Sequence, residues 1–316
     1  MRTRREFLGG AAASTLLLPA FLAGCGGQSK NFGIGVIPYE EPRKEKEEYV
    51  GFGDFVGKRI DGRPADVFIA SDYVGVISAL EADQIDAAYL NPLGYVIASN
   101  RARKVGHPLI PIAMPYVIYQ GKGDLTYEGV IFTRKDSGVK SLADLKGKSV
   151  AFNEPTSTSG YLYPVAMLLK AGVNPKPAPE GDLKQVFFAG AQGVVPAVLH
   201  KQAAAGAIFE QGIELSLPDP ADRAKLKILA RTDPIPNGML VARGTLDPAA
   251  VEKLKQAMRE INSDPMGKLY LKKMGVEKWV PPQDNLFDPV RKAAAILKLD
   301  LPTSAQRAAA TAKSKG

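Results

Sequence analysis

Short apolar runs alternate with longer amphipathic stretches through the first third of the chain. Residues 65–70 and 85–90 are short, apolar and bounded by polar residues, which is typical of strands. Residues 72–83 between them have the apolar spacing of a helix, and Ser71 or Asp72 is a suitable N-cap. The predicted elements are strands at 31–38, 65–70 and 85–90, and helices at 40–57, at 72–83 and from Pro92 onward.

The same alternation restarts in the middle of the chain. Alternating strands and helices predict parallel sheets with crossover helices, so we expect two α/β units in series. Two further strands flank the turn at residues 234–238, and a tail rich in Ala and Lys, residues 304–316, is expected to fray. The predicted elements are strands at 130–133, 149–152, 185–188, 205–209, 227–230 and 239–242, and helices at 141–145, 160–171, 194–201, 248–263 and 265–273.

The first 24 residues have the layout of an export signal. Three Arg precede an apolar run at residues 11–22, which is shorter than the roughly 20 residues of a membrane-spanning helix. Arg4-Arg5-Glu6-Phe7-Leu8 resembles a twin-arginine signal, although the early positive charges also suit general secretion. Leu22-Ala23-Gly24-Cys25 resembles a bacterial lipobox, so we expect lipidation of Cys25 and a tether at residues 25–30. The alternative is an ordinary cleavage site with a Cys nearby by chance.

Composition and charge exclude several classes of protein. The 316 residues include 45% hydrophobic residues and one Cys, so the chain is globular, without an internal disulfide or a thiolate-rich metal site. Removal of residues 1–24 takes three Arg and one Glu from 41 basic and 33 acidic residues, which leaves a net charge of +6. No basic block is interleaved with aromatic residues, so we expect no nucleic-acid partner. A mildly positive field helps to collect an anionic ligand.

The residues for catalysis are also missing. The only two His are His107 and His200, both expected at the surface, and no Cys nucleophile is available within the body of the protein. The sequence lacks a Gly-Lys-Ser/Thr phosphate loop, a paired-His metal motif and a nucleophile elbow. We therefore expect no enzyme activity, no cofactor and no metal site.

Residues 153–159 form a polar loop between a predicted strand and the helix that begins near Gly160. Hydroxyls, free backbone N–H groups and the positive end of the helix dipole converge there, an arrangement that favours a tetrahedral oxyanion. The alternative is that Ser157-Thr158-Ser159 only caps the helix, which explains one of the three hydroxyls.

Five segments, in order and spacing, resemble one family. They are residues 36–39 (Val-Ile-Pro-Tyr), 69–77, 85–90, 134–138 and 157–161. The chain resembles the phosphate/phosphite/phosphonate substrate-binding proteins of bacterial ABC importers. That resemblance implies an α/β, bilobed periplasmic-binding-protein fold of type II, with two parallel or mixed sheets flanked by helices and joined by a two-strand hinge near residues 127–130 and 229–236. Residues 31–126 and 233–316 would form the first lobe and residues 127–232 the second.

The resemblance also implies which residues bind the oxyanion. By position these are Tyr73, Tyr127, Ser157, Thr158 and Ser159. The two tyrosines are otherwise core aromatics with an exposed hydroxyl. Tyr161 and Tyr163 are expected to pack within the helix.

The chain departs from the family pattern around three further candidate residues, Gln192, Glu210 and Asn237. Ala191 and Gln192 stand where the family has a His, while Glu210 and Asn237 stand where its phosphonate binders place acids for a ligand amine. A buried ammonium without a carboxylate is costly, so an aminoalkylphosphonate is disfavoured unless Glu210 supplies the charge. Two interpretations stay open: the pocket binds phosphate, phosphite or a small phosphonate, or it carries a more apolar ligand such as a lipid or a sterol-like molecule.

We consider three possible functions, each from a different class of protein. The leading expectation is a monomeric, exported lipoprotein that works in the periplasm and passes its ligand to an inner-membrane ABC permease. The second is a sensor whose closure is read by a membrane kinase. The third, an enzyme of the related pyrimidine-synthesis kind, requires His and Cys groups that this chain lacks.

Overall fold

The computed structural model describes residues 31–38, 42–177, 179–188 and 190–297. The predicted export segment, Cys25, the tether, Tyr39 and the tail at 304–316 lie outside these residues. Contacts divide the chain into Met1–Lys30 and Asn31–Gly316, and the description below concerns the second unit. In the part of the chain that is described, no helix combines the length and the apolar character needed to cross a bilayer.

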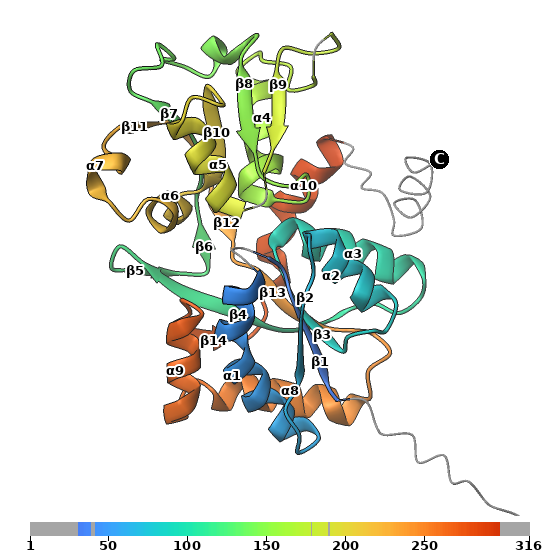
Figure 1. Ribbon diagram of the computed structural model, residues 1–316. Helices are drawn as coiled ribbons and strands as arrows, with labels where there is room; N and C mark the ends of the chain where they lie inside the picture. The colour runs from blue at the N-terminus through green and yellow to red at the C-terminus, as the bar shows by residue number, and fades with distance from the viewer. Residues whose placement is uncertain (1–30, 39–41, 178, 189, 298–316) are drawn as a thin grey trace, which may run out of the picture. The chain divides into compact units, whose positions relative to one another are not determined.

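The first lobe is built on a mixed sheet, which within the described residues has seven strands in the order β14-β4-β13-β3-β1-β2, with β5 paired to β4 (Figure 1). Strands β1, β2 and β3 are parallel, whereas β13, β4 and β14 pair in antiparallel fashion. The strand bounds are β1 Gly33–Val36, β2 Asp66–Ile69, β3 Ala87–Leu90, β4 Ile110–Tyr119, β5 Lys122–Asp124, β13 Met239–Ala242 and β14 Lys278–Val280.

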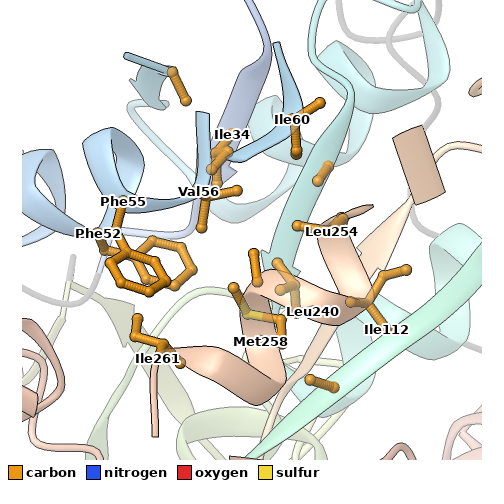
Figure 2. Close-up of a cluster of buried hydrophobic side chains, with 14 of the residues drawn as sticks. Ile34, Phe52, Phe55, Val56, Ile60, Ile112, Leu240, Leu254, Met258 and Ile261 are labelled. Carbon is orange, nitrogen blue, oxygen red and sulfur yellow. The ribbon is translucent and has the colours of Figure 1, made fainter. Parts of the chain in front are cut away.

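Helices cover both faces of this sheet because successive strand residues point to opposite sides. Along β13, for example, Leu240 joins one core and Val241 the other. Figure 2 shows the first core, where side chains of α1 and α8 meet strand residues such as Ile34 and Ile112. The helices are α1 Pro42–Ile60, α8 Pro248–Glu260 and α9 Pro265–Lys273 on this side, and α2 Tyr73–Glu81, α3 Pro92–Lys104 and α10 Asp288–Ile296 on the other.

The second lobe has its own sheet, with five strands among the described residues in the order β11-β7-β10-β8-β9. Apolar side chains of α5 and α6 pack on one face, and those of η1 and α4 pack on the other. The elements are β7 Gly129–Arg134, η1 Ala143–Leu145, β8 Ser149–Phe152, η2 Thr158–Leu162, α4 Tyr163–Lys170, β9 Lys184–Phe187, α5 Gly190–Leu199, β10 Ala205–Phe209, α6 Gln211–Ser216, α7 Pro220–Arg223 and β11 Leu226–Arg231.

Two short strands connect the lobes. β6 (Thr126–Tyr127) enters the second lobe and β12 (Ile235–Pro236) leaves it, and the two pair in antiparallel fashion apart from both larger sheets (Figure 1). The backbone N–H of Thr232 donates to the carbonyl of Gly129 (2.9 Å), and the Thr232 hydroxyl accepts from the Gly129 N–H (2.9 Å). After η3 (Asp284–Phe287) and α10, Leu297 contacts the cores of both lobes.

The predicted fold class is confirmed, with one correction to the sheets. Strand–helix alternation predicts parallel pairing, but both sheets are mixed, as the family resemblance allowed: β13 runs antiparallel to β3 and β4, and β7 runs antiparallel to β10 and β11. The ten-residue strand β4 was missed because it contains Pro111 and Pro115, and proline usually argues against a central strand. A shift of register in its pairing with β13, between Leu240 and Val241, accompanies these prolines. The helices α6, α7 and α10 were also missed.

Candidate functional site

A cleft of about 660 Å³ is lined by residues of both lobes and of the two connecting strands. Every predicted binding residue lies on its wall. They are Tyr73 of lobe 1; Ser157, Thr158, Ser159, Gln192 and Glu210 of lobe 2; and Tyr127 and Asn237 at or beside the connecting strands. The structure therefore gathers at one place side chains that are up to 164 positions apart in the sequence, from 73 to 237.

Of the described helices, α2, α3, η2 with α4, and α5 begin at this cleft, as does the short α6, whose Glu210 and Gln211 line it. Tyr73 opens α2, Asn91 caps α3, Ser157 caps η2 and its continuation α4, and Gln192 lies in the first turn of α5. The first N–H groups of a helix have no partner inside the helix and carry the positive end of its dipole. Side chains of the protein already accept from several of these N–H groups, including those of Tyr73, Leu93 and Gly160, so an anion would interact with the helix dipoles and the remaining donors.

The hydroxyls of Ser157 and Thr158 act as acceptors inside the protein. Ser157 Oγ accepts from the Gly160 N–H at 3.1 Å, as the helix-capping alternative expected. Thr158 Oγ1 accepts from the Leu93 N–H at 2.9 Å. A hydroxyl that accepts still has one proton to donate, and no acceptor for either proton is found among the described residues. Both side chains can therefore donate to a ligand oxygen.

Tyr127 continues this hydroxyl array. Its phenol donates to Ser159 Oγ over 3.4 Å, which leaves the Ser159 proton for a ligand. Burial raises the pKa of Tyr127 above its ordinary value of 10.0, and the nearby Tyr89 and Tyr163 hydroxyls raise it further, while the bond to Ser159 acts in the opposite direction. Tyr127 is therefore a neutral donor at physiological pH. We call Tyr73, Tyr127, Ser157, Thr158 and Ser159 the hydroxyl end of the cleft.

The loop at residues 153–158 touches both helix starts of lobe 1. Glu154 Oε2 accepts from the Tyr73 N–H at 2.9 Å, and Asn91 Nδ2 donates to the Thr156 carbonyl at 2.8 Å. The side-chain amide of Asn153 also donates to the Tyr73 hydroxyl at 3.4 Å. These bonds connect the lobes directly at one edge of the cleft.

Asn91 and Glu154 were not predicted as functional residues. Asn91-Pro92 is a sequence signature of an N-cap followed by proline in the first turn, and it marks a polar side chain at the start of α3. The role of Glu154 had no such signal, because its partner Tyr73 is 81 residues away in sequence.

Glu210 lines the cleft, but its carboxylate is already paired with a cation. It accepts from Nη2 of Arg231, whose Nε lies 3.4 Å from Glu128 Oε2. Arg231 is thus held between two carboxylates at the end of β11. A ligand ammonium would have to compete with Arg231 for Glu210.

Gln192 and Asn237 differ in the side-chain hydrogen-bonding groups that they leave available to a ligand. Gln192 is exposed, and no hydrogen bond of its side chain occurs within the described residues. The Asn237 amide donates to the carbonyls of Pro115 (3.1 Å) and Asp124 (3.2 Å). The side-chain N–H groups of Asn237 are therefore used by the β4–β5 hairpin, and only the side-chain oxygen of Asn237 remains available to a ligand.

A group of aromatic and aliphatic side chains of lobe 1 also lines the cleft, together with the charged neighbours Glu48 and Lys273. Trp279 of β14 is 4% exposed, lies edge to face with Tyr89 (ring centroids 5.8 Å apart) and stacks on Phe52 (6.0 Å). Tyr49 of α1 belongs to the same group and packs edge to face with Phe52 at 6.4 Å. We call the set Tyr49, Tyr89, Met274, Val276 and Trp279 the aromatic end.

Residues expected outside the site lie outside it. Tyr161 packs edge to face on Phe152 in lobe 2, with ring centroids 5.4 Å apart. Tyr163 is 8% exposed and packs against the core between α2, α3 and α10. His107 and His200 are exposed and do not line the cleft. Within the described ranges, no three His, Cys, Asp or Glu side chains gather as a metal site would require.

Two sheet-bearing lobes around a cleft, joined by a pair of crossing strands, define a ligand-binding protein of the periplasmic type. A family model described as "ABC transporter, phosphonate, periplasmic substrate-binding protein" matches residues 34–287. The chain belongs to this family. It is therefore a substrate-binding component of a transporter, and its place is the periplasm.

Individual relatives agree with this assignment. The chain is 29% identical over 229 residues to the phosphate-import protein PhnD of Mycolicibacterium smegmatis, covering 70% of this chain and 69% of that one. It is 26% identical over 287 residues to the phosphonates-binding periplasmic protein of Escherichia coli, covering 89% and 80%. The fold resembles a binding protein component of an ABC phosphonate transporter from Pseudomonas aeruginosa, with a TM-score of 0.72, 24% identity and coverage of 88% and 92%.

Proposed function

We propose that the protein captures a phosphorus oxyanion, phosphate, phosphite or a phosphonate, at the hydroxyl end of the cleft. The observation that carries the proposal is the convergence of helix starts with hydroxyls that can donate but are already engaged as acceptors. Such a site offers hydroxyl donors to a tetrahedral anion, and the carboxylate at its edge, Glu154, is itself engaged by the Tyr73 N–H. Charge-assisted hydrogen bonds of this kind are about twice as strong as neutral ones.

Charged residues of both signs line the rest of the cleft, namely the cations Lys122 and Lys273 and the anions Glu48, Asp124, Glu128 and Glu210. Lys122 and Lys273 are exposed lysines on its wall, and no ion pair of either is found among the described residues. The carboxylate of Glu210 is occupied by Arg231. We therefore propose that an aminoalkylphosphonate binds more weakly than an alkylphosphonate of the same length.

We further propose that residues 31–126 and 233–316 move against residues 127–232 about the pair β6–β12. Short connecting strands are the kind of segment that absorbs the dihedral changes of a hinge. Closure would bring the loop at 153–158 onto α2 and α3, and the bonds Glu154–Tyr73 and Thr158–Leu93 support this geometry.

The lipid anchor is a proposal from sequence. Cleavage before Cys25 followed by acylation would hold the protein at the membrane beside an ABC permease, as a monomer. Intact-mass measurement of the protein purified from membranes tests it, because an acylated Cys25 adds the mass of the lipid. A soluble protein cut elsewhere in the first 30 residues would contradict it, with Cys25→Ser as the control that releases the protein.

Calorimetry with the mature protein tests the oxyanion assignment. Phosphate, phosphite and methylphosphonate are titrated separately, and a lipid extract is compared by its effect on the melting temperature. A ligand that binds only the folded protein raises the melting temperature by mass action. If all three phosphorus oxyanions fail at millimolar concentration while the lipid shifts the melt, the proposed function is wrong.

A further inference from the structure

The cleft is much larger than the anion assigned to it. Its volume is about 660 Å³. A tetrahedral oxyanion has five bonded heavy atoms and occupies at most on the order of 150 Å³, at roughly 30 Å³ for each water-sized atom. An anion bound at the hydroxyl end therefore leaves most of the cleft to another part of the ligand or to water.

The hydroxyl end and the aromatic end are continuous. Ser159 contacts the phenol of Tyr127, and Tyr127 and Tyr89 line the same cleft. Tyr89 in turn meets Trp279 with ring centroids 5.8 Å apart. A substituent on an anion held at Ser159 would thus extend over tyrosine rings toward the aromatic end.

The opposite lobe also presents apolar side chains to the cleft. Phe209 ends β10, and Leu215 of α6 is 48% exposed although it is a large aliphatic residue. A flat apolar group on the aromatic end would be covered from the other side by these residues when the lobes meet. Exposed apolar side chains that border a cleft are a common feature of binding sites.

An uncharged apolar ligand fits these observations less well. It would bury the donors of Ser157, Thr158 and Ser159 without an acceptor, and a buried unsatisfied donor costs about 1–3 kcal/mol. A ligand with one anionic and one apolar part satisfies both ends. The hydroxyl end would hold the charge, and the aromatic end would remove the apolar part from water.

We propose that the ligand class of this cleft is a phosphonate whose phosphorus carries a flat apolar substituent, such as an aromatic ring. The inference rests on the proposed capture of a phosphorus oxyanion at the hydroxyl end. Tyr89, which packs on Trp279 and lines the same cleft as Tyr127, is then the residue that determines the preference for the substituent.

Calorimetry with phenylphosphonate, methylphosphonate and inorganic phosphate tests the inference on the unmodified mature protein. Phenylphosphonate is expected to bind at least about tenfold more tightly than methylphosphonate, or ~1.4 kcal/mol, because only the phenyl compound buries a ring. Equal affinity, or tighter binding of methylphosphonate, overturns the inference and leaves the oxyanion function intact. Failure of all three compounds overturns both.

Substitutions in the cleft test which residues cause the preference for a phenyl over a methyl substituent. Tyr89→Leu is expected to reduce the phenyl-to-methyl affinity ratio to within about threefold. Tyr116→Leu makes the same change on β4, on a tyrosine that does not line the cleft, and keeps the full ratio. Leu215→Ala, on an exposed side chain, lowers the ratio with little risk to folding. An unchanged ratio in both Tyr89→Leu and Leu215→Ala overturns the assignment.

Discussion

The two ends of the cleft are built in different ways. The hydroxyl end is formed largely by short segments at helix starts, where a capping residue and its neighbours supply hydroxyls and N–H groups together. The aromatic end is assembled from α1, β3, β14 and the segment after α9, which are far apart in sequence. Local geometry can thus define how an anion is held, whereas long-range packing defines what the anion may carry.

Loss of one hydroxyl is the strongest way to test the hydroxyl end. Thr158→Ala removes a donor for the ligand and the acceptor for the Leu93 N–H of the other lobe. We expect the affinity for methylphosphonate to fall by about 1–3 kcal/mol. Calorimetry measures it, with Thr158→Ser as the matched control that keeps the hydroxyl. Unchanged affinity in Thr158→Ala would remove this residue from the site.

A methyl group added at Gly238, next to Tyr89, tests the aromatic end. A Cβ at Gly238 would lie 2.4 Å from the Leu90 carbonyl oxygen and 2.7 Å from Cε2 of Tyr89. Gly238→Ala must therefore shift the Tyr89 ring or the strand below it, at a cost of about 1–3 kcal/mol in the free energy of unfolding. Chemical denaturation measures that cost, and calorimetry should show a larger loss of affinity for phenylphosphonate than for methylphosphonate. Equal losses would mean that the ring has no separate role.

The contact between Glu154 and α2 tests whether closure depends on protein contacts. Glu154→Ala removes the acceptor of the Tyr73 N–H, so the closed form should lose about 1 kcal/mol relative to the open form. Small-angle scattering of the ligand-free protein should then report a larger radius of gyration. Glu180→Ala is the control, since Glu180 is 76% exposed and pairs with Lys176 on the surface. Identical scattering from both variants would contradict a closing role for Glu154.

The smallest effect that we expect concerns pH. The contribution of the Tyr127 hydroxyl to ligand affinity should not change as the solution becomes alkaline. Because burial raises the pKa of Tyr127, its proton stays bound in the folded protein at a pH where an exposed tyrosine would lose it. The stabilisation from the neutral phenol is present below the unfolded pKa near 10 and is lost only as pH rises above it. The affinity ratio of wild type to Tyr127→Phe for methylphosphonate should therefore be constant between pH 8 and pH 10. A steady fall of this ratio from pH 8 would show that Tyr127 titrates normally.

Much of the fold could be predicted because its signals are local. Strand and helix periods placed most elements, and the caps Asp72 and Ser157 are used as their residue types suggest. The exceptions have physical causes. Pro111 and Pro115 concealed β4, and antiparallel pairing of β13 follows from a chain return that no local pattern encodes.

The candidate site, like the fold, could be predicted only in part from the sequence. The resemblance to a known family and the polar loop at residues 153–159 led to residues that all line the cleft. Sequence could not reveal that Arg231 occupies Glu210, that the Asn237 donors are bound to backbone carbonyls, or that Thr158 contacts Leu93. Each of these depends on a partner that lies more than 20 positions away in the chain.

By itself the sequence determined the two α/β units, the family and the chemistry of the capped helix start, because periodicity and hydrogen-bonding capacity belong to residues and their near neighbours. Only the tertiary structure decided which donors and carboxylates remain available to a ligand and that an aromatic wall adjoins them. Those properties depend on distances between segments that are remote in the chain, and such distances are set by packing of the two cores rather than by any local pattern.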